Sequence, residues 1–174
     1  MSVPGRLVLF CGIPGSGKST VAGLVAKMSM PSVQLQTDGL RSMIAEPTYS
    51  AEESEFVYQA CIAAAKVALD MGYLTILDGT FGSRRRRDGA LSALEGHCSS
   101  VNVVHVVCGL DTALQRNSRR RVPVPAENLR GILAGFDVPE GAITVDTSET
   151  GAVEAALLVL RAINPMVAPG SMTL

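Results

Sequence analysis

The sequence predicts an α/β fold in which a parallel β-sheet lies between two layers of helices. Short apolar runs bounded by Gly, Asp or Ser alternate along the chain with longer stretches of helical periodicity. One run, residues 101–107, is almost continuously apolar, which is typical of a buried strand in a parallel sheet. Because alternating strands and helices pair their strands in parallel, we expect a three-layer domain with a five-stranded, mostly parallel sheet.

The individual elements follow from the spacing of apolar residues and from local end signals. We expect a helix that begins at Ser50 and ends before Gly72, with Ser50 as the N-cap and Glu53 completing a capping box. His105 lies inside an expected strand and is predicted to be a core residue, whereas His97 is expected at a helix end. The remaining expected strands are 7–11, 33–36, 73–77 and 142–145, and the remaining expected helices are 18–28, 38–45, 83–95, 111–119, 125–136 and 151–163.

The composition describes one domain without a membrane segment. A chain of 174 residues, 47% hydrophobic and 18% charged, can bury a single core, so we expect one domain over 1–163 and a C-terminal tail over 164–174. The uninterrupted apolar runs are too short to span a bilayer, and the four cysteines show no metal-ligand spacing. With no signal-peptide pattern at its start, the sequence predicts a cytoplasmic protein without a membrane partner.

The arginines gather in two places, although the net charge is only −1. Four occupy residues 84–87, and the second group consists of Arg116, Arg119, Arg120 and Arg121. Arginine presents a planar set of donors that suits phosphate oxygens, so these clusters favour anion binding at one place over a broad nucleic-acid track. The alternative interpretation is two solvated helix faces.

The most specific motif follows the first expected strand, where the segment from Gly12 to Ser19 matches G-x-x-x-x-G-K-S. Glycines let backbone N–H groups turn around phosphate oxygens, and the following helix adds the positive end of its dipole. Lys18 is expected to bridge the β- and γ-phosphates of ATP, and the Ser19 hydroxyl to bind Mg²⁺. The alternative is a glycine-rich turn without a ligand. The predicted nucleotide-binding residues of this P-loop are Gly12, Pro14, Gly15, Ser16, Gly17, Lys18, Ser19 and Thr20.

The motifs that accompany the loop favour a small kinase. The sequence has no NKxD-like guanine-reading motif and no room for the extra helical domain of a large ATPase. Asp38 follows the second expected strand, at the carboxyl edge of the sheet, and is the candidate general base; its alternative role is a helix N-cap. Arg41 lies on the same helical face and is expected to hold an anionic group of the acceptor.

Two further segments complete the expected site. Asp78 follows the apolar residues of the third expected strand, as the acid of a Walker B element does. It is a candidate ligand of Mg²⁺ and a candidate contact of the acceptor. Thr80 is expected either to hydrogen-bond the acceptor or to shape the turn. The candidate lid is 116–125, where a helix rich in arginine changes to an extended VPVP segment. Closing it would bring Arg116 and Arg120 over ATP and exclude water. The alternative is an exposed helix end whose cations suit the dipole.

Together these motifs resemble the polynucleotide 5′-hydroxyl kinase domain of phage and bacterial end-healing enzymes, within the AAA_33-like group of small P-loop kinases. The resemblance rests on GIPGSGKST, TDGLR, ILDGT, RNSRR and NLRGIL in this order, and it extends from Leu7 to Asp146. It implies that Asp38 is the general base for the 5′-hydroxyl and that Arg41 contacts the adjacent nucleic-acid phosphate. It also implies that Arg120 reaches the transferred phosphate and that residues 145–148 lie near the adenine.

The sequence therefore predicts an ATP-dependent, Mg²⁺-requiring phosphotransferase, with the 5′-hydroxyl end of RNA or DNA as the expected acceptor. The chain has no Trp, so base stacking would depend on Phe81, Tyr49, Tyr58 or arginine planes, and Arg85 in the 84–87 cluster is expected to line a basic entrance. One alternative is a small-molecule kinase acting on a sugar, nucleoside, antibiotic or related hydroxyl-bearing acceptor. Another is a nucleotide-dependent regulatory switch.

Overall fold

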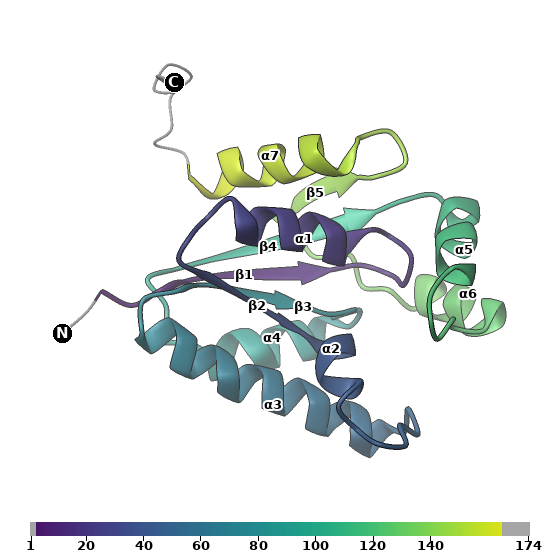
Figure 1. Cartoon of the computed structure of the whole chain (residues 1–174), viewed down its shortest axis with the longest axis horizontal. Coiled ribbons are helices and arrows are strands. Elements are labelled where there is room, and N and C mark those ends of the chain that lie inside the picture. Colours follow the sequence, from purple (N-terminus) through teal and green to yellow (C-terminus); the bar gives the residue numbers. More distant parts are fainter. Residues whose placement is uncertain (1–2, 165–174) are drawn as a thin grey trace.

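The computed structural model describes residues 3–164 and confirms the three-layer α/β architecture. A five-stranded sheet has the order β2-β3-β1-β4-β5, and all four strand pairings are parallel. Figure 1 shows α1 and α7 on one face of the sheet, α3 and α4 on the other, and α5 and α6 beyond the ends of the strands. The strands are β1 (Arg6–Cys11), β2 (Ser32–Gln36), β3 (Leu74–Asp78), β4 (Ser100–Val107) and β5 (Ile143–Asp146).

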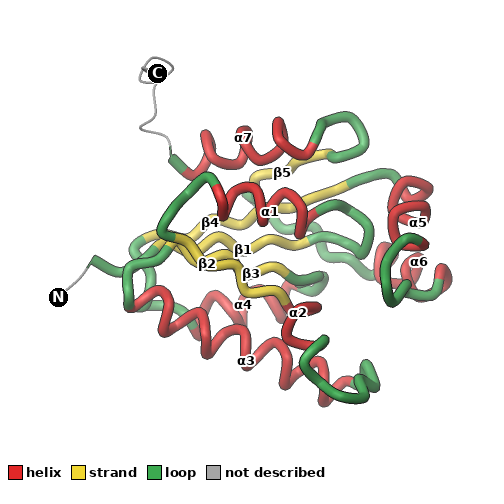
Figure 2. The backbone as a smooth tube through the Cα atoms, in the orientation of Figure 1, coloured by secondary structure: helices red, strands yellow, loops and turns green. Residues whose placement is uncertain are grey.

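The helices lie where the sequence predicts them, with one clear difference in length. They are α1 (Lys18–Lys27), α2 (Thr37–Arg41), α3 (Ala51–Asp70), α4 (Arg84–Ala93), α5 (Leu110–Ser118), α6 (Ala126–Ala134) and α7 (Ala152–Ile163). The expected helix 38–45 ends early, at Arg41, and the chain then crosses to α3 as a loop (Figure 2). Met43 is 84% exposed, so a further turn would bury little apolar surface to stabilise it.

Strand β1 divides the core into two layers. Val8 and Phe10 face α1 and α7, while Leu7 and Leu9 face α3 and α4, and all four side chains are fully buried. This alternation is the period of a strand with both faces covered. Because β1 lies between β3 and β4, the loop that follows it emerges at the middle of the carboxyl edge of the sheet.

The N-terminus of α3 confirms the predicted cap but not the capping box. The Ser50 hydroxyl accepts a hydrogen bond from the Glu53 N–H at 3.1 Å. The Glu53 carboxylate does not return to the Ser50 N–H; it accepts from the Thr48 hydroxyl at 2.9 Å and pairs with Arg41. A nearby guanidinium attracts the carboxylate more strongly than a neutral amide does, so the box prediction was wrong.

The two histidines lie where they were expected. His105 is 7% exposed in β4 and stacks on Phe136 with a ring-centroid distance of 5.0 Å. Burial, helped by the charge of Arg87, lowers the pKa of His105, so the ring is a neutral part of the core. His97 follows α4 and its Nδ1 lies 2.8 Å from the Asp70 carboxylate at the end of α3.

The C-terminal prediction is only partly covered by the structure. Of the expected tail, 164–174, all but Asn164 lies outside the described residues. The Asn164 side-chain oxygen accepts a hydrogen bond from Arg6 at the start of β1. Within residues 3–164, none of the helices has both the length and the hydropathy needed to cross a bilayer.

Replacing Leu9 by Ala is expected to destabilise the fold by about 2–5 kcal/mol, because Leu9 is fully buried between β1 and α3–α4 and its truncation leaves a cavity. Urea unfolding followed by circular dichroism would measure the change. Val67→Ala is the matched control, since Val67 is 60% exposed and its loss should change the free energy of unfolding by no more than about 0.5 kcal/mol. Equal losses for both variants would contradict the assignment of Leu9 to the core.

Candidate active site

The P-loop backbone packs so closely on its neighbours that a side chain at either of two glycines would displace the neighbouring backbone. Gly12 has φ 151° and Gly15 has φ 84°. A Cβ added to Gly12 would lie 2.3 Å from the Val106 carbonyl oxygen, and one added to Gly15 would lie 2.3 Å from the Ala113 carbonyl oxygen. The loop is therefore shaped by backbone contacts with β4 and α5. Because Gly12 and Gly15 have no side chain, nothing covers the backbone at these positions, as a phosphate cradle requires.

Helix α1 begins at the end of this loop without a side-chain cap. Its N-cap is Gly17, with φ 86°, and its first turn carries no acidic residue. The N–H groups of the first turn therefore face the loop together with the positive end of the helix dipole. Lys18 is 7% exposed, and the Ser16 hydroxyl is buried and has no hydrogen-bond partner among residues 3–164. These features fit the triphosphate of ATP.

Asp78 is the buried acid of the site. It is 2% exposed at the end of β3, where its Oδ2 accepts a hydrogen bond from Gln34 Nε2 at 3.1 Å. Its Oδ1 is buried and has no hydrogen-bond partner among the described residues. Burial raises the pKa of Asp78, an effect opposed by the charge of Lys18 and by the Ser19 hydroxyl. A buried carboxylate with one oxygen open to a further partner is suited to binding a cation.

Ser19 and Asp78 offer the oxygen ligands that Mg²⁺ prefers. Within residues 3–164, His, Cys, Asp and Glu form no group of three or more that could hold a metal ion. A cation here would therefore depend on these two side chains together with phosphate oxygens and water, which is how Mg²⁺ is usually held beside nucleotides. The unpartnered Asp78 oxygen is the observation that supports this fit.

Asp38 lies inside the first turn of α2 and does not cap it. The N-cap is Gln36, which makes no side-chain cap hydrogen bond, so the alternative role expected for Asp38 is wrong. Its side chain is 62% exposed and forms an ion pair with Arg120, which belongs to the turn between α5 and α6. The candidate base and the candidate lid arginine are thus brought together, although they are far apart in the sequence.

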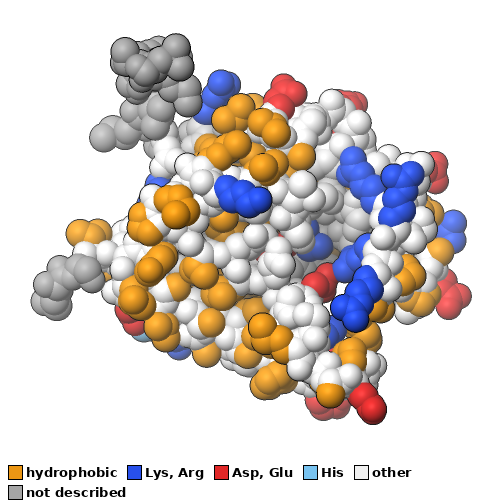
Figure 3. All heavy atoms as spheres, viewed as in Figure 1, with side chains coloured by type: hydrophobic (Ala, Val, Ile, Leu, Met, Phe, Trp, Pro, Cys, Tyr) orange, Lys and Arg blue, Asp and Glu red, His pale blue; other side chains and the backbone are white. Residues whose placement is uncertain are grey.

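The candidate lid, 116–125, extends from the last turn of α5 to the residue before α6. Asn117 holds the turn between the two helices, because its side chain donates to the Val124 carbonyl at 2.7 Å and accepts from the Val124 N–H at 3.1 Å. Arg116 donates to the Thr147 hydroxyl at 2.8 Å and to the Thr147 carbonyl at 2.9 Å. Figure 3 shows Lys and Arg side chains gathered around a hollow on this side of the molecule.

Arg41 contacts other residues of the chain at the edge of the site. Its guanidinium forms an ion pair with Glu53, donates to the Ser54 hydroxyl at 3.1 Å and lies 4.8 Å from the centroid of the Tyr49 ring. The Arg41 side chain is only 11% exposed. Arg41, which was predicted to contact the acceptor, is therefore a largely buried cation whose charge is offset by Glu53.

The 84–87 cluster separates into different environments. Arg87 is buried and donates to the Phe81 carbonyl at 2.8 Å, whereas Arg84 is exposed and lies 3.5 Å from Asp88. Arg85 is exposed, and the guanidinium of Arg86 lies 4.3 Å from the centroid of the Tyr58 ring. Arg87 therefore supports the loop after β3 and is not part of a basic entrance.

The loop after β3 also corrects the expected stacking residues. Phe81 is fully buried, so it cannot stack on a ligand, and that prediction was wrong. Its ring packs edge-on against Tyr58 with the centroids 4.9 Å apart, which is why it points inward. Thr80 is half-buried, and its carbonyl accepts from the Gly12 N–H at 3.1 Å, so it supports the P-loop.

Two residues of the site were not found from the sequence. Gln34 links β2 to Asp78 and also donates to the Ser19 carbonyl at 3.3 Å. Thr147 donates to the Ser16 carbonyl at 2.7 Å and so joins the P-loop to Arg116. The alternating polar residues of β2 were a signal for Gln34. Thr147 lies in the segment 145–148 that the resemblance places near the adenine, but its contacts with Ser16 and Arg116 were not predicted.

The fold, together with the G-x-x-x-x-G-K-S loop between β1 and α1, defines the P-loop class of α/β proteins. The particular family follows from the sequence: a family model described as an AAA domain, AAA_33, matches residues 7–139. The chain belongs to this family.

Curated relatives match part of the chain. Rv2004c of Mycobacterium tuberculosis (strain ATCC 25618 / H37Rv), described as an uncharacterized protein, is 36% identical over 95 residues, which cover 47% of this chain and 19% of the relative. A protein of Mycobacterium bovis, Mb2027c, matches with the same identity and coverage. The chain thus spans less than a fifth of the length of these relatives.

Solved structures share the fold over nearly the whole chain. The Mycobacterium tuberculosis APS kinase CysC, solved with AMPPNP and APS, has a TM-score of 0.73 at 20% identity and covers 94% of this chain and 99% of that chain. A sugar kinase from Janibacter sp. HTCC2649 has a TM-score of 0.68 at 23% identity and covers 92% and 94%. A chain of the Pnkp1/Rnl/Hen1 RNA repair complex has a TM-score of 0.67 at 19% identity and covers 86% and 52%.

Asp78→Asn is expected to raise the melting temperature of the ligand-free protein at neutral pH. The folded state there holds a buried carboxylate with a raised pKa, and the amide removes that desolvation penalty. As the pH falls through the raised pKa of Asp78, wild type takes up a proton in the folded state and its penalty disappears. The difference in melting temperature between wild type and Asp78→Asn should therefore narrow as the pH falls toward 3.8, the ordinary pKa of an aspartate. Thermal unfolding at several pH values measures this, and a gap that widens on acidification would contradict it.

Proposed function

We propose that the protein transfers the γ-phosphoryl group of ATP to a hydroxyl group, and that the acceptor is the 5′-hydroxyl end of RNA or DNA. One observation carries the proposal. Strands β2, β3 and β1 are neighbours in the sheet. Asp38 follows β2, Asp78 is the last residue of β3, and the P-loop follows β1. A base, a metal-binding acid and a phosphate cradle thus share one edge of the sheet, where open α/β folds bind their ligands.

Each residue then has a defined task in phosphoryl transfer. The P-loop amides and Lys18 hold the β- and γ-phosphates, while Asp38 accepts the proton of the attacking hydroxyl. Arg120 stabilises the charge that spreads over the transferred group. Mg²⁺, when bound through Ser19 and Asp78, would neutralise phosphate charge.

The Asp38–Arg120 ion pair gives these events an order. The Asp38 carboxylate has to contact the attacking hydroxyl, but in the structure it contacts the Arg120 guanidinium, so the pair must separate before Asp38 acts as the base. The phosphates of ATP present Arg120 with a stronger anionic partner than one carboxylate. We therefore propose that ATP binds first and that the acceptor hydroxyl then meets a released Asp38.

The nucleic-acid end is supported by the cationic residues around the site. Arg85 is exposed near the loop after β3, and Arg119 and Arg121 are exposed in the lid turn. In this proposal Arg41 contacts the first acceptor phosphate, for which its pair with Glu53 must open. The similarity of fold to a chain of the RNA repair complex is consistent with such an acceptor.

A small hydroxyl-bearing molecule is the second candidate acceptor. The observation that favours it is the Arg41–Glu53 pair, because a cation whose charge is already offset selects less strongly for a phosphodiester. The folds of APS kinase and of a sugar kinase are similar to this one. The two candidates differ in the salt dependence of acceptor binding, which is steep when phosphate contacts release counterions.

The deciding experiment is transfer from γ-labelled ATP with Mg²⁺. A 5′-hydroxyl oligonucleotide, its 5′-phosphorylated twin and a set of sugars and nucleosides are offered as acceptors. Label on the 5′-hydroxyl oligonucleotide alone supports the proposal. Label on the small molecules alone supports the second candidate, and label on neither overturns both.

Asp38→Ala is expected to lower kcat by at least about a hundredfold, because the attacking hydroxyl loses its proton acceptor. ATP affinity should not fall and is expected to rise, because the phosphates of ATP no longer compete with Asp38 for Arg120. Steady-state kinetics and ATP titration measure the two effects. Asp88→Ala is the control, because Asp88 is an exposed aspartate of α4 whose side chain is 65% exposed. A kcat near that of wild type in Asp38→Ala would remove Asp38 from the mechanism.

A further inference from the structure

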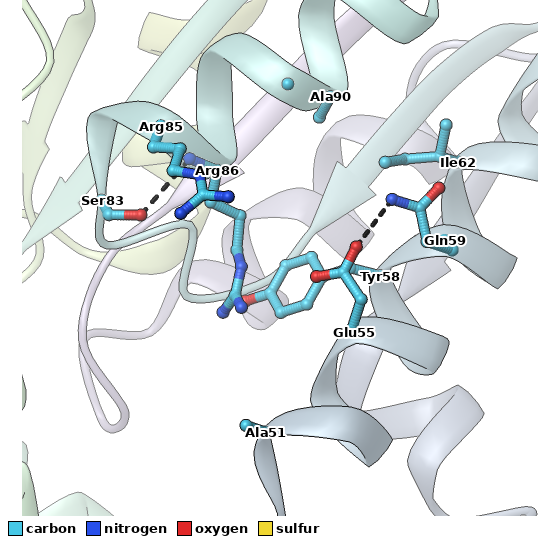
Figure 4. Close-up of a pocket in the computed structure, with 10 residues that line it drawn as sticks. Ala51, Glu55, Tyr58, Gln59, Ile62, Ser83, Arg85, Arg86 and Ala90 are labelled. Carbon is cyan, nitrogen blue, oxygen red and sulfur yellow. Dashed lines mark hydrogen bonds between the residues drawn. The ribbon is translucent and has the colours of Figure 1, made fainter.

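A cavity of about 460 Å³ lies between α3 and α4, outside the P-loop. Its volume falls in the range of about 300–1,000 Å³ typical of sites for small molecules. Figure 4 shows Arg86 reaching from α4 toward the Tyr58 ring of α3, while Glu55 and Gln59 enter from the α3 side. The cavity therefore combines an aromatic ring, two arginines and a carboxylate–amide pair in one place.

The cavity lies beside the loop that follows β3 and close to Arg41. The Tyr58 hydroxyl accepts a hydrogen bond from the Phe81 N–H at 3.3 Å, and Phe81 belongs to the loop that follows Asp78. Arg41, which contacts the acceptor in the proposed function, donates to the Ser54 hydroxyl at 3.1 Å, and Ser54 precedes Glu55 of the cavity lining. A group held in this cavity thus lies on the acceptor side of the proposed site.

Arg86 is the planar surface that the cavity offers. One face of its guanidinium is covered by the Tyr58 ring, at 4.3 Å from the ring centroid. Arginine in this arrangement loses little freedom when a flat ring stacks on its other face, and arginine planes stack on bases in this way. Other candidates are committed elsewhere, since Phe81 is fully buried and the Tyr49 ring lies against Arg41.

The rim of the cavity supplies both hydrogen-bond acceptors and a cationic donor. Gln59 donates to the Glu55 carboxylate at 2.8 Å, which leaves the Gln59 carbonyl and further Glu55 lone pairs for a ligand. Arg85 also lines the cavity and is exposed, so its guanidinium is available to an anion. A flat ring with hydrogen-bonding edges and a nearby phosphate would use all of these groups.

We infer that this cavity binds the terminal nucleobase of the acceptor, stacked on Arg86, with Arg85 joining Arg41 at the first phosphate. The inference rests on the proposed function and makes the acceptor a nucleotide-bearing end read through its first base. The hydrogen-bonding edge of that base meets Glu55 and Gln59. Specificity for the end then comes from one unit of the strand, and the following units add only phosphate contacts.

A second cavity, of about 530 Å³, is less suited to this role. It lies on the other side of α4 and is lined by Arg84 and Arg87, but also by Asp88, Asp137 and Glu140. Three carboxylates against two guanidiniums disfavour an anionic ligand. Arg84 and Arg87 are in addition paired with Asp88 and with the Phe81 carbonyl.

The test compares two 5′-hydroxyl oligonucleotides that differ only in their first unit, which either carries a base or is abasic. In wild type the abasic end is expected to raise the acceptor KM about tenfold, the scale of one base stacked on a planar side chain. Arg86→Ala and Arg86→Lys should both raise the KM of the intact end to that of the abasic end, because lysine keeps the charge but not the plane. The KM for ATP should not change.

Arg161→Ala serves as the control, since Arg161 is an exposed arginine of α7 on the other face of the sheet, and it should keep the tenfold ratio. Thermal unfolding checks that the Arg86 variants remain folded. A ratio that persists in Arg86→Lys, or equal KM values for both ends in wild type, overturns the inference and leaves the proposed function intact. Failure of wild type to label either oligonucleotide overturns the proposed acceptor and this inference together.

Discussion

The site depends on the close packing of the P-loop backbone against two other elements. The carbonyl oxygens of Val106 in β4 and Ala113 in α5 occupy the space that side chains at Gly12 and Gly15 would need. Ala113 belongs to α5, and Thr147 links the Ser16 carbonyl to Arg116 of the same helix. The P-loop and α5 are therefore one packed unit, and this unit positions the start of the turn that carries Arg120.

The charges of the site are largely paired with one another. Arg120 holds Asp38, and Arg41 holds Glu53, while Asp78 is buried with one oxygen unpartnered. Ligands of opposite charge would compete for these groups: phosphates for the arginines and a cation for Asp78. Because breaking such a pair without a replacement leaves a charge unpaired, each ligand must supply the missing partner. This requirement links the order of ligand binding to electrostatics.

Neighbouring arginines have different fates because a helix turns about 100° at each residue. Arg87 faces the core and supports the Phe81 carbonyl, Arg86 covers Tyr58, and Arg84 points to solvent beside Asp88. The consecutive arginines of 84–87 therefore have different surroundings in the structure, although they are identical in the sequence. Phe81 lies in a loop next to the site but contributes to the core, because its ring packs against Tyr58.

The sequence by itself determined the layers, the P-loop and the positions of Asp38 and Asp78, because these follow from local periodicity and from the rule that parallel strands end at one edge. Only the tertiary structure decided the pairing of Asp38 with Arg120, the withdrawal of Arg41 to Glu53 and the parts played by Gln34 and Thr147. Those contacts join residues from separate elements, and their partners are chosen by helix rotation and loop length. No pattern along a single stretch of chain encodes that choice.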